Sequence, residues 1–440
     1  MDEQAGKQKR GKRRAHDLAY VLGEGASVGR SRVAQDAMSV APLVLFNAIF
    51  AAAVYFLVVV TRDANARITD ISIVMASLAA LPVAIAFVLV SLRDHEQPIT
   101  VATLATVIAA AVMIAILSAV RVSMSYWAIL LSAIPTALVM IAVMLRLKRA
   151  QSERVAILDF PGAEAALKEL GGDLPVIRGA DADLGQFDRF LIDISTHYSD
   201  QWSRFLLRSY MRGVLVTPWV QFLETRRGRV AIDSFDLSDV VLRPGQILYS
   251  RAKRVLDIFG VIVALPFAVV IGSLTYVYIL LRAGPPVLFR QQRRGYGGRE
   301  FTMVKFRTMR HAPGEGEQWA QDKDNRIVPG LGLIRKFRFD EIPQLYNIWR
   351  GEMSWIGPRP ASLDVAEATE AVEPKYQSRL LVRPGLSGWA QVNSGYAGTV
   401  REEIEKLGYD LYYVKHMSFD LDLLVMARTV RILLLRTGAK

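Results

Sequence analysis

Two adjacent acids, Asp340 and Glu341, lie in a strongly basic part of the sequence, within the segment FDEIPQ. Basic side chains surround them along the chain, at Lys305, Arg307, Arg335, Arg338, Arg359, Arg379 and Arg383. A guanidinium matches two phosphate oxygens at once, so several of them together would neutralise a diphosphate. A solvated helix face is the simpler explanation for adjacent acids, but here a basic run precedes them and an apolar stretch with Pro343 follows. The pattern therefore favours a site that handles phosphates.

The acid pair could perform two kinds of chemistry on a phosphate. Carboxylates are hard oxygen ligands of the kind that Mg²⁺ takes beside substrate phosphates. An aspartate can also attack phosphorus directly and form an acyl-phosphate intermediate. The sequence has no GxxxxGK[ST] loop, no kinase HRD or DFG set, and no cysteine for a thiolate metal site or a nucleophile. The residues thus predict phosphoryl chemistry without a P-loop.

A membrane region precedes these residues in the sequence. The chain has 440 residues, 52% of them apolar, and carries 54 Lys and Arg against 42 Asp and Glu, a formal charge of +12. This apolar share excludes a disordered chain. The apolar residues gather in runs close to the ~20 residues that cross a hydrocarbon core as a helix. The runs are 43–61, 71–92, 99–120 and 126–145, and they predict four transmembrane helices within a region over 43–148.

Basic residues indicate how these helices are oriented. Residues 1–42 form a basic arm, and Arg146 and Lys148 follow the last run, whereas the connectors between runs hold few basic residues. The positive-inside rule places both ends of the region in the cytoplasm, in agreement with an even number of crossings. The arm is interpreted as this topology signal and not as a nucleic-acid-binding segment, because no base-reading module accompanies it. No nucleic-acid partner is expected.

Residues 154–235 predict a small α/β domain. Helical patterns at 162–170, 199–211 and 219–225 separate short β-branched runs at 154–158, 174–177, 189–194, 213–217 and 229–233. Such alternation implies a parallel sheet. The turn after the first run reads LDFPGAEAA and lacks a glycine-rich phosphate loop. We therefore expect a degenerate Rossmann-like scaffold for contacts or regulation, followed by a linker over 236–250.

Residues 255–281 are long and apolar enough for a fifth crossing, but two features oppose one. Pro266 lies near the middle, and both flanks are basic, with Arg251, Lys253 and Arg254 before the run and Arg282 and Arg290 after it. A crossing segment should have asymmetric flanks. A helix that breaks at the proline and returns to the same side of the membrane would explain both features. A re-entrant hairpin is the favoured prediction.

Four segments of the C-terminal part, taken in order, resemble a known family. They are KRVLDIFG, GPPVLFRQQRRGYGGREFTMVKFRTM, DNRIVPGLGLIRKFRFDEIPQLYNIWRGEMSWIGPRP and VRPGLSGWAQVN. This set strongly resembles the bacterial sugar transferases, the monotopic polyprenol-phosphate phosphoglycosyl transferases, over about residues 250–436. With four preceding helices and an α/β domain, the chain is similar to the large form of that family, as found in exopolysaccharide, capsule and O-antigen synthesis.

The resemblance implies an enzyme that transfers a hexose 1-phosphate from a UDP-sugar to undecaprenyl phosphate and releases UMP. It implies a monotopic α/β catalytic domain over 250–440, at the cytoplasmic face of a bacterial inner membrane. The partners would be the UDP-sugar, undecaprenyl phosphate and membrane lipid, and a homodimer is possible in such a protein. Which hexose is used does not follow from these motifs.

The resemblance also assigns residues to roles. Asp340 falls on the family nucleophile, and Glu341 would assist with Mg²⁺, both acids being metal ligands. Pro266 matches the central proline of the family's re-entrant helix. The substrate-binding positions implied by the motifs are Lys305, Arg307, Arg335, Arg359, Arg379, Arg383, Gln391 and Asp410. Of these, Asp410 matches a further acidic position of the family whose role is less defined.

The sequence departs from the family pattern at two places. It has FDEIPQ where DELPQ is usual, and QVNS where QVNG is usual, with Gly395 one residue later. Neither departure changes a charge or a ligand type, so we interpret them as changes in packing and in sugar preference. The aromatic stretches 345–355 and 409–435 fit either helices at the membrane interface or a folded core.

Two other functions are open. A glycosyltransferase that moves the sugar alone would release UDP, and it would need a spaced acidic motif such as DxD, whereas these acids are adjacent. A non-enzymatic scaffold of polysaccharide assembly would have no need of two acids among so many basic residues.

Overall fold

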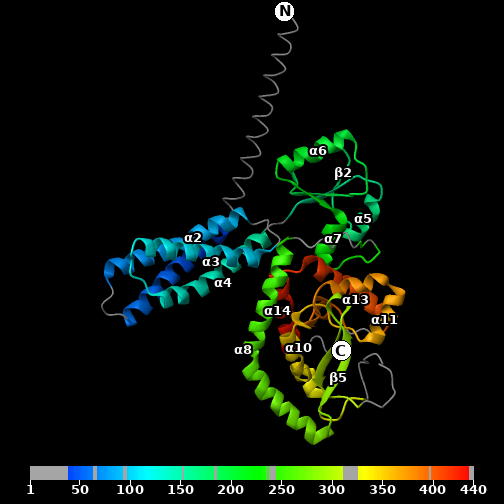
Figure 1. The fold of residues 1–440 in the computed structure, drawn as a ribbon. Coiled ribbons are helices and arrows are strands. Elements are labelled where there is room, and N and C mark those ends of the chain that lie inside the picture. The colour runs from blue at the N-terminus through cyan, green and yellow to red at the C-terminus, as the bar shows by residue number, and fades with distance from the viewer. Residues whose placement is uncertain are drawn as a thin grey trace, which may run out of the picture. The chain divides into compact units, whose positions relative to one another are not determined.

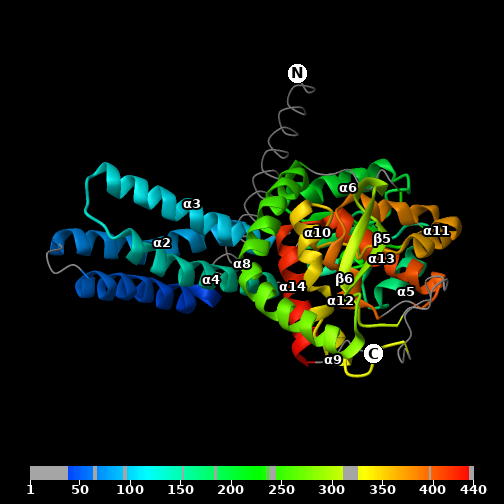
Figure 2. The same ribbon diagram turned by 60° about the horizontal axis from the view of Figure 1, so that its bottom comes forward.

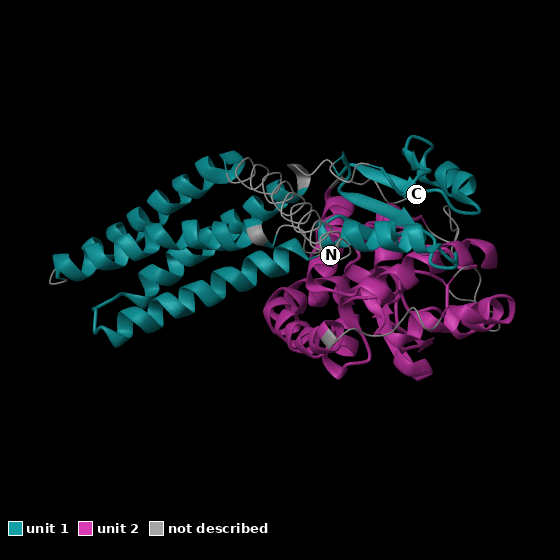
Figure 3. Ribbon diagram, turned by 90° about the horizontal axis from the view of Figure 1, so that it is seen from above, with its two compact units in different colours: residues 1–222 teal, residues 223–440 magenta. Residues whose placement is uncertain are grey.

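The computed structural model describes residues 38–62, 67–92, 97–150, 153–182, 186–233, 235–236, 244–310, 326–395 and 398–435. The chain divides into two compact units, residues 1–222 and 223–440, which Figure 3 shows in separate colours. Nearly all of the predicted basic arm over 1–42, and half of the predicted linker over 236–250, lie outside the described residues.

Long apolar helices make up the first part of unit 1 (Figure 1, Figure 2). They are the helix Met38–Arg62, α2 (Ile68–Ser91), α3 (Pro98–Ala119) and α4 (Tyr126–Ala150). Each is long and apolar enough to cross a membrane. Their inner faces pack together around side chains such as Leu89 and Met144, while Phe46 and Phe87 are 63% and 77% exposed. Phe46 and Phe87 are two of many exposed large apolar side chains on these helices, and such a surface suits a lipid environment. The prediction of a membrane protein with four N-terminal apolar helices is confirmed.

The second part of unit 1 is a parallel sheet with helices between its strands. Its elements are β1 (Val155–Leu158), α5 (Ala163–Leu170), β2 (Val176–Ile177), β3 (Arg189–Ile192), α6 (Asp200–Met211), β4 (Leu215–Pro218) and α7 (Trp219–Arg227), the last of which continues into unit 2. The strand order is β2-β1-β3-β4, and every pair is parallel. Buried Phe190 and Phe205 pack between the sheet and α6, because the strands are apolar on the face that the helix covers. The predicted alternation of strands and helices is present.

The predicted strand at 229–233 is wrong. This segment contains turns and no strand, and it belongs to unit 2. The Val230 amide donates to the Gly408 carbonyl at 3.0 Å, and Val230 is buried with Phe235 against Leu407 and Leu411. An alternating apolar pattern shows only that one side of the segment is buried. Here the apolar side chains pack against helix α13 (Val400–His416) and not within a sheet.

Unit 2 begins with one long helix, α8 (Pro244–Ala283), of 40 residues with Pro266 inside it. Figure 1 shows that this helix bends along its length but is not split in two. A proline inside a helix removes one hydrogen bond and bends the axis, which is the physical reason to expect a bend here. The expected break into two separate helices is therefore absent from α8. Large apolar side chains on α8, among them Phe259, Phe267 and Leu274, are more than 60% exposed.

Both halves of α8 contact the rest of unit 2. In the first half, the Asp257 carboxylate accepts hydrogen bonds from Ser354 Oγ at 2.9 Å and from the Trp355 amide at 3.2 Å. In the second half, Ile279 is fully buried in a cluster that contains Phe306 and Leu331. The helix is thus packed on a single folded unit over most of its length.

Short elements follow and build the rest of unit 2. They are β5 (Leu288–Arg294), η3 (Tyr296–Gly298), β6 (Glu300–Phe306), α9 (Gly332–Lys336), η4 (Phe339–Gln344), α10 (Leu345–Arg350), β7 (Ser354–Ile356), α11 (Leu363–Val372), η5 (Pro374–Leu381), β8 (Gly385–Ser387), α12 (Trp389–Asn393), α13 (Val400–His416) and α14 (Phe419–Leu435). Strands β5 and β6 form an antiparallel hairpin, and β7 pairs with β8 in parallel. A Cβ on Gly385 would lie 2.1 Å from the Gly357 amide nitrogen, so the chain needs glycine where the end of β7 approaches β8.

Candidate active site

The two acids lie on η4, a short 3-10 helix that a left-handed residue introduces. Arg338 has φ 55°, and its carbonyl accepts a hydrogen bond from the Glu341 amide at 3.1 Å. The next residues turn tightly, so that the two neighbouring carboxylates have different surroundings. Glu341 is buried, whereas Asp340 is half-buried.

Arginine side chains hold Glu341. Arg359 Nη2 lies 2.7 Å from Glu341 Oε1, and Arg338 Nη1 lies 3.8 Å from Oε2. Burial by itself raises the pKa of the Glu341 carboxyl, but Arg359 and Arg338 outweigh it, so that the pKa is lowered. Oε2 is buried and has no hydrogen-bond partner among the described residues. Glu341 is therefore ionised near neutral pH and has one oxygen available to a further ligand.

Asp340 is in the opposite situation. Burial and the neighbouring Glu341 raise its pKa to about 6, although Arg335, Lys305 and Arg359 act to lower it. No hydrogen bond or ion pair joins the Asp340 carboxylate to the other residues that the structure describes. A carboxylate that is ionised at neutral pH, lacks a protein partner and faces several cations is suited to attack an electrophile that carries negative charge.

The structure brings three of the predicted phosphate-binding residues to the acids. Lys305, on β6, Arg335, on α9, and Arg359, after β7, each act on the Asp340 charge. Burial lowers the pKa of Lys305 to about 8, and the positive charges of Arg293 and Arg359 add to this effect. Its ammonium also lies 4.8 Å from the centre of the Phe289 ring, the residue opposite it in the hairpin. Three cations of different elements thus converge on one carboxylate.

Other predicted residues have protein partners elsewhere in unit 2. Arg307 Nη2 donates to the carbonyls of Ala283 and Gly284, both at 2.7 Å, and so joins the end of α8 to β6. Arg383 lies over the Tyr296 ring at 5.8 Å. Arg379 is buried and paired with Asp410 at 2.6 Å. These contacts are with the protein itself, and a substrate-binding role for these residues stays a prediction.

Gln391 lies on α12, which follows strand β8, the partner of β7. Its Oε1 atom is buried without a hydrogen-bond partner among the described residues, and it lies 3.4 Å from where a Cβ on Gly388 would be. The same Cβ would lie 2.4 Å from the Gly357 carbonyl. Gln391 therefore lies near Gly357, two residues before Arg359, and among the described residues no hydrogen bond joins it to the two acids.

Arg293 is a candidate that the sequence did not single out. It lies on β5, its Nη1 donates to the Pro360 carbonyl at 3.2 Å, and its charge acts on Lys305. In the sequence it is one of several basic residues that follow the apolar run 255–281. The alternation of strand β5 could have indicated it, because residues 289, 291 and 293 share one face of the hairpin with Lys305.

Comparisons with known proteins agree on one family. The family model described as "Bacterial sugar transferase" matches residues 248–436. A relative from Aeromonas hydrophila, named UDP-N-acetylgalactosamine-undecaprenyl-phosphate N-acetylgalactosaminephosphotransferase, is 34% identical over 295 residues, which are 67% of this chain and 70% of the relative.

Two relatives named UDP-glucose:undecaprenyl-phosphate glucose-1-phosphate transferase are also similar. One, from Xanthomonas campestris pv. campestris, is 40% identical over 34% of this chain and 32% of its own length. The other, from Caulobacter vibrioides, is 35% identical over 46% of this chain and 78% of its own length. The similarity thus includes relatives whose names give different sugars.

Proposed function

Because this chain belongs to the bacterial sugar transferase family and is a transferase enzyme, we propose that it transfers a hexose 1-phosphate from a UDP-sugar to undecaprenyl phosphate and releases UMP. The observation that carries the proposal is the Asp340 carboxylate, which no hydrogen bond or ion pair joins to another described residue and on which the charges of Lys305, Arg335 and Arg359 act. A diphosphate bound by these cations would present phosphorus to the Asp340 carboxylate. The names of the relatives agree with this donor and this acceptor.

The proposed mechanism has two displacements at one phosphorus atom. The Asp340 carboxylate attacks the β-phosphorus of the donor, the bond to the bridging oxygen breaks, and UMP leaves with that oxygen and its electron pair. An oxygen of undecaprenyl phosphate then attacks the same phosphorus, and the Asp340–phosphorus bond breaks. The carboxylate is regenerated, and the lipid carries a diphosphate-linked sugar. Division into two steps lets two bulky substrates use the same site in turn.

The cations have distinct tasks in this scheme. Lys305 and Arg335 lie where they can hold the phosphate oxygens of the donor, and thereby lower the repulsion between two anions. Arg359 holds Glu341 at 2.7 Å and keeps it ionised. Their fixed positions cost no reorganisation when charge develops on the leaving UMP.

Mg²⁺ fits the residues present, and we propose that Asp340 and Glu341 hold it. The buried Glu341 Oε2, which has no hydrogen-bond partner among the described residues, is a natural ligand atom. No cluster of three or more acidic or histidine side chains occurs in the described part of the chain, but Mg²⁺ is commonly held by one or two carboxylates together with substrate phosphates. When bound, the ion would neutralise phosphate charge and orient the diphosphate.

We further propose that α8 enters the membrane from the cytoplasmic side and returns to it, as a bent helix and not as two separate helices. Both halves of α8 pack on unit 2, which a helix with its two ends on opposite sides of a bilayer could not do. Exposed Tyr346 and Trp349 on α10, and exposed Val430 and Leu434 on α14, would extend the lipid-facing surface. The opposite face of α14 is buried in the core through Leu421 and Val425. In this proposal the stretch 409–435 therefore contributes both to the membrane interface and to the folded core.

This arrangement can be tested with single cysteines, since the chain has none. Ala252→Cys and Ala283→Cys, near the two ends of α8, should both resist a membrane-impermeant maleimide added to intact cells. Both should react after the cells are made permeable. Ser123→Cys, in the exposed turn between α3 and α4, is the matched control and should react in intact cells. Labelling of only one of the α8 cysteines in intact cells would show a true fifth crossing.

The lowered pKa of Lys305 leads us to expect that activity falls at alkaline pH. Its pKa is lowered to about 8 by burial and by Arg293 and Arg359, so its charge is present below pH 8 and is lost above it. Because kcat/KM reports the ionisation of the free enzyme, kcat/KM for the UDP-sugar should fall as pH rises through about 8. Lys305→Arg keeps its charge throughout and should remove this limb. An unchanged alkaline limb in that variant would show that another group titrates.

For the α/β domain of unit 1 we propose a Rossmann-like scaffold with a role in contacts or regulation. The turn between β1 and α5 carries only Gly162 and offers no glycine-rich phosphate loop. A homodimer stays a prediction, as does the assignment of the chain to the bacterial inner membrane.

The released nucleotide tests the proposed function. Membranes that contain the protein should be incubated with undecaprenyl phosphate and a panel of UDP-sugars, beginning with UDP-glucose and UDP-N-acetylgalactosamine. Release of UMP with one of these donors supports sugar 1-phosphate transfer. Release of UDP would instead show a glycosyltransferase, and no turnover with any donor would favour a scaffold.

A further inference from the structure

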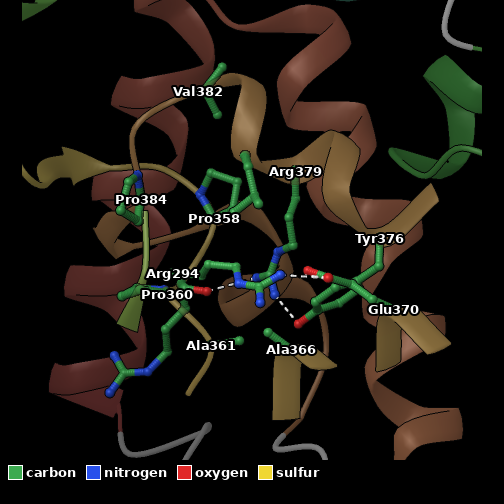
Figure 4. Close-up of a pocket in the computed structure, with 12 residues that line it drawn as sticks. Arg294, Pro358, Pro360, Ala361, Ala366, Glu370, Tyr376, Arg379, Val382 and Pro384 are labelled. Atoms are coloured by element: carbon green, nitrogen blue, oxygen red, sulfur yellow. Dashed lines mark hydrogen bonds and ion pairs between the residues drawn. The ribbon is translucent and has the colours of Figure 1, made fainter. Parts of the chain in front are cut away.

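Arg379, on η5, is a buried cation close to the segment that carries Arg359. Its side chain is 5% exposed, and Figure 4 shows it pointing toward Tyr376 and the loop of Pro358 and Pro360. Arg379 Nη2 donates to the Arg359 carbonyl at 2.7 Å and also pairs with Asp410 Oδ2 at 2.6 Å. Arg379 Nη1 donates to the Tyr376 hydroxyl and pairs with Glu403 at 3.3 Å. The guanidinium is therefore engaged on both terminal nitrogens.

The loop from Pro358 to Ala361 depends on its carbonyl groups for position. Prolines have no N–H group, so this loop can form few hydrogen bonds as a donor. Each carbonyl accepts a hydrogen bond instead: Pro358 from the Gly385 amide at 2.9 Å, Arg359 from Arg379, Pro360 from Arg293 at 3.2 Å, and Ala361 from the Arg294 amide at 3.4 Å. The bond to the Arg359 carbonyl is thus the one that fixes the backbone of the arginine that holds Glu341.

Asp410, on α13, controls the direction of that bond. The same Arg379 nitrogen contacts both the Asp410 carboxylate and the Arg359 carbonyl. Asp410 is 2% exposed, and a charge pair buried to this extent contributes little net stability because its desolvation is costly. The contribution of Asp410 is therefore geometric, because its carboxylate contacts the nitrogen that donates to the Arg359 carbonyl.

On the basis of the proposed function, we propose that Arg379 and Asp410 are positioning residues that act on the reaction through Arg359 and do not touch the substrate. The resemblance in sequence implied a place in the substrate site for both. In the structure, however, a substrate phosphate would have to displace Asp410 or the Arg359 carbonyl to reach the guanidinium. The pair therefore fixes the backbone of Arg359 without lining the substrate site itself.

A double-mutant cycle tests this proposal on the full-length protein in detergent. We expect Asp410→Asn to lower kcat/KM by about 10- to 100-fold, as is usual when a residue that orients a catalytic group is lost. Arg359→Lys should lower it by about 100- to 1,000-fold. Because Asp410 acts through Arg359, the double variant should be no worse than Arg359→Lys alone, within about threefold. Losses that multiply would overturn the proposal.

Glu224→Gln is the matched control. Glu224 forms a buried pair with Lys415, which also lies on α13, at 2.8 Å, and among the described residues no hydrogen bond or ion pair joins either side chain to the segment of Arg359. Its loss should leave kcat/KM within about twofold of wild type. A comparable loss in this variant would show that any broken buried pair on α13 damages the enzyme, and the proposal would fail.

Hydrogen exchange supplies a readout that needs no turnover. In Asp410→Asn, the amides of the segment from Gly357 to Leu363 should exchange faster than in wild type, whereas the amides of β5 should not change. This result separates the proposal from the proposed function, since it stands even if no UDP-sugar is turned over. If Asp410→Asn does not fold, Tyr376→Phe removes one partner of Arg379 and should give a smaller effect in the same segment. Unchanged exchange of this segment in a folded variant would contradict the positioning role.

Discussion

Asp340→Asn should lower turnover by about 10⁴-fold or more, the loss usual for removal of a nucleophile, and should leave the protein at least as stable as wild type. The amide has almost the same volume as the carboxylate but is a poor nucleophile, so the first displacement fails. UMP release measured with a saturating UDP-sugar gives the turnover, and thermal unfolding in detergent gives the stability.

The sign of the stability change follows from the pKa of Asp340. Burial and the neighbouring Glu341 raise this pKa to about 6, above the usual value for aspartate. The folded protein thus prefers the protonated form, and folding is penalised at pH 7, where the carboxylate is ionised. A neutral amide removes the penalty, so the unfolding temperature should rise or stay the same. This opposition between stability and activity is typical of catalytic groups.

Asp364→Asn is the control for this substitution. Asp364 is an exposed acid in the first turn of α11, and its replacement should change turnover by less than about twofold. Turnover of Asp340→Asn above one hundredth of wild type would contradict a nucleophilic role, as would a loss of activity that only accompanies a large loss of stability.

Glu341→Gln should lower turnover by about 100- to 1,000-fold, the range seen when one preorganised charged contact is removed. Arg359 and Arg338 would lose the carboxylate that they share, and the proposed metal site would lose one of its two charged ligands. The loss cannot come from Asp340 being protonated, because Glu341 raises the pKa of Asp340 and its neutralisation would lower that pKa.

Two measurements check the Glu341 prediction. The Mg²⁺ concentration needed for half-maximal turnover should increase in Glu341→Gln, and added Mg²⁺ should restore only part of the activity. Glu352→Gln is the control, since Glu352 pairs with Arg350 at 3.2 Å and no hydrogen bond or ion pair among the described residues joins it to the two acids. An unchanged Mg²⁺ requirement would remove Glu341 from the metal site.

The sequence predicted the parts of the fold that depend on local pattern. The four apolar runs are recognisable because a membrane crossing has a fixed length, and the strands β1 to β4 because β-branched runs alternate with amphipathic helices. The segment at 229–233 has the same alternation but is buried against α13, and only the folded chain shows which surface covers it. Likewise Pro266 indicates a bend in α8 but not whether the helix continues through it.

The sequence predicted which residues form the candidate site, but not the ion pairs and hydrogen bonds between them. Motif and residue type pointed to Asp340, Glu341 and the cations that converge on them. The same reasoning assigned Arg379 to substrate binding, because the sequence does not show that this arginine is paired with Asp410, 31 positions away. That pairing, and the role of Arg293, depend on the packing of η5 and β5 around the loop of Arg359.

The most direct test of a covalent intermediate on Asp340 is a single turnover without the lipid acceptor. Protein and Mg²⁺ are mixed with a UDP-sugar labelled in both the sugar and the β-phosphate, and released UMP and protein-bound label are measured together. We expect one burst of UMP, close to one per protein, with both labels bound to wild type and none bound to Asp340→Asn. Release of UMP only after undecaprenyl phosphate is added, with no label on the protein at any time, would contradict it and would make the lipid phosphate the direct nucleophile.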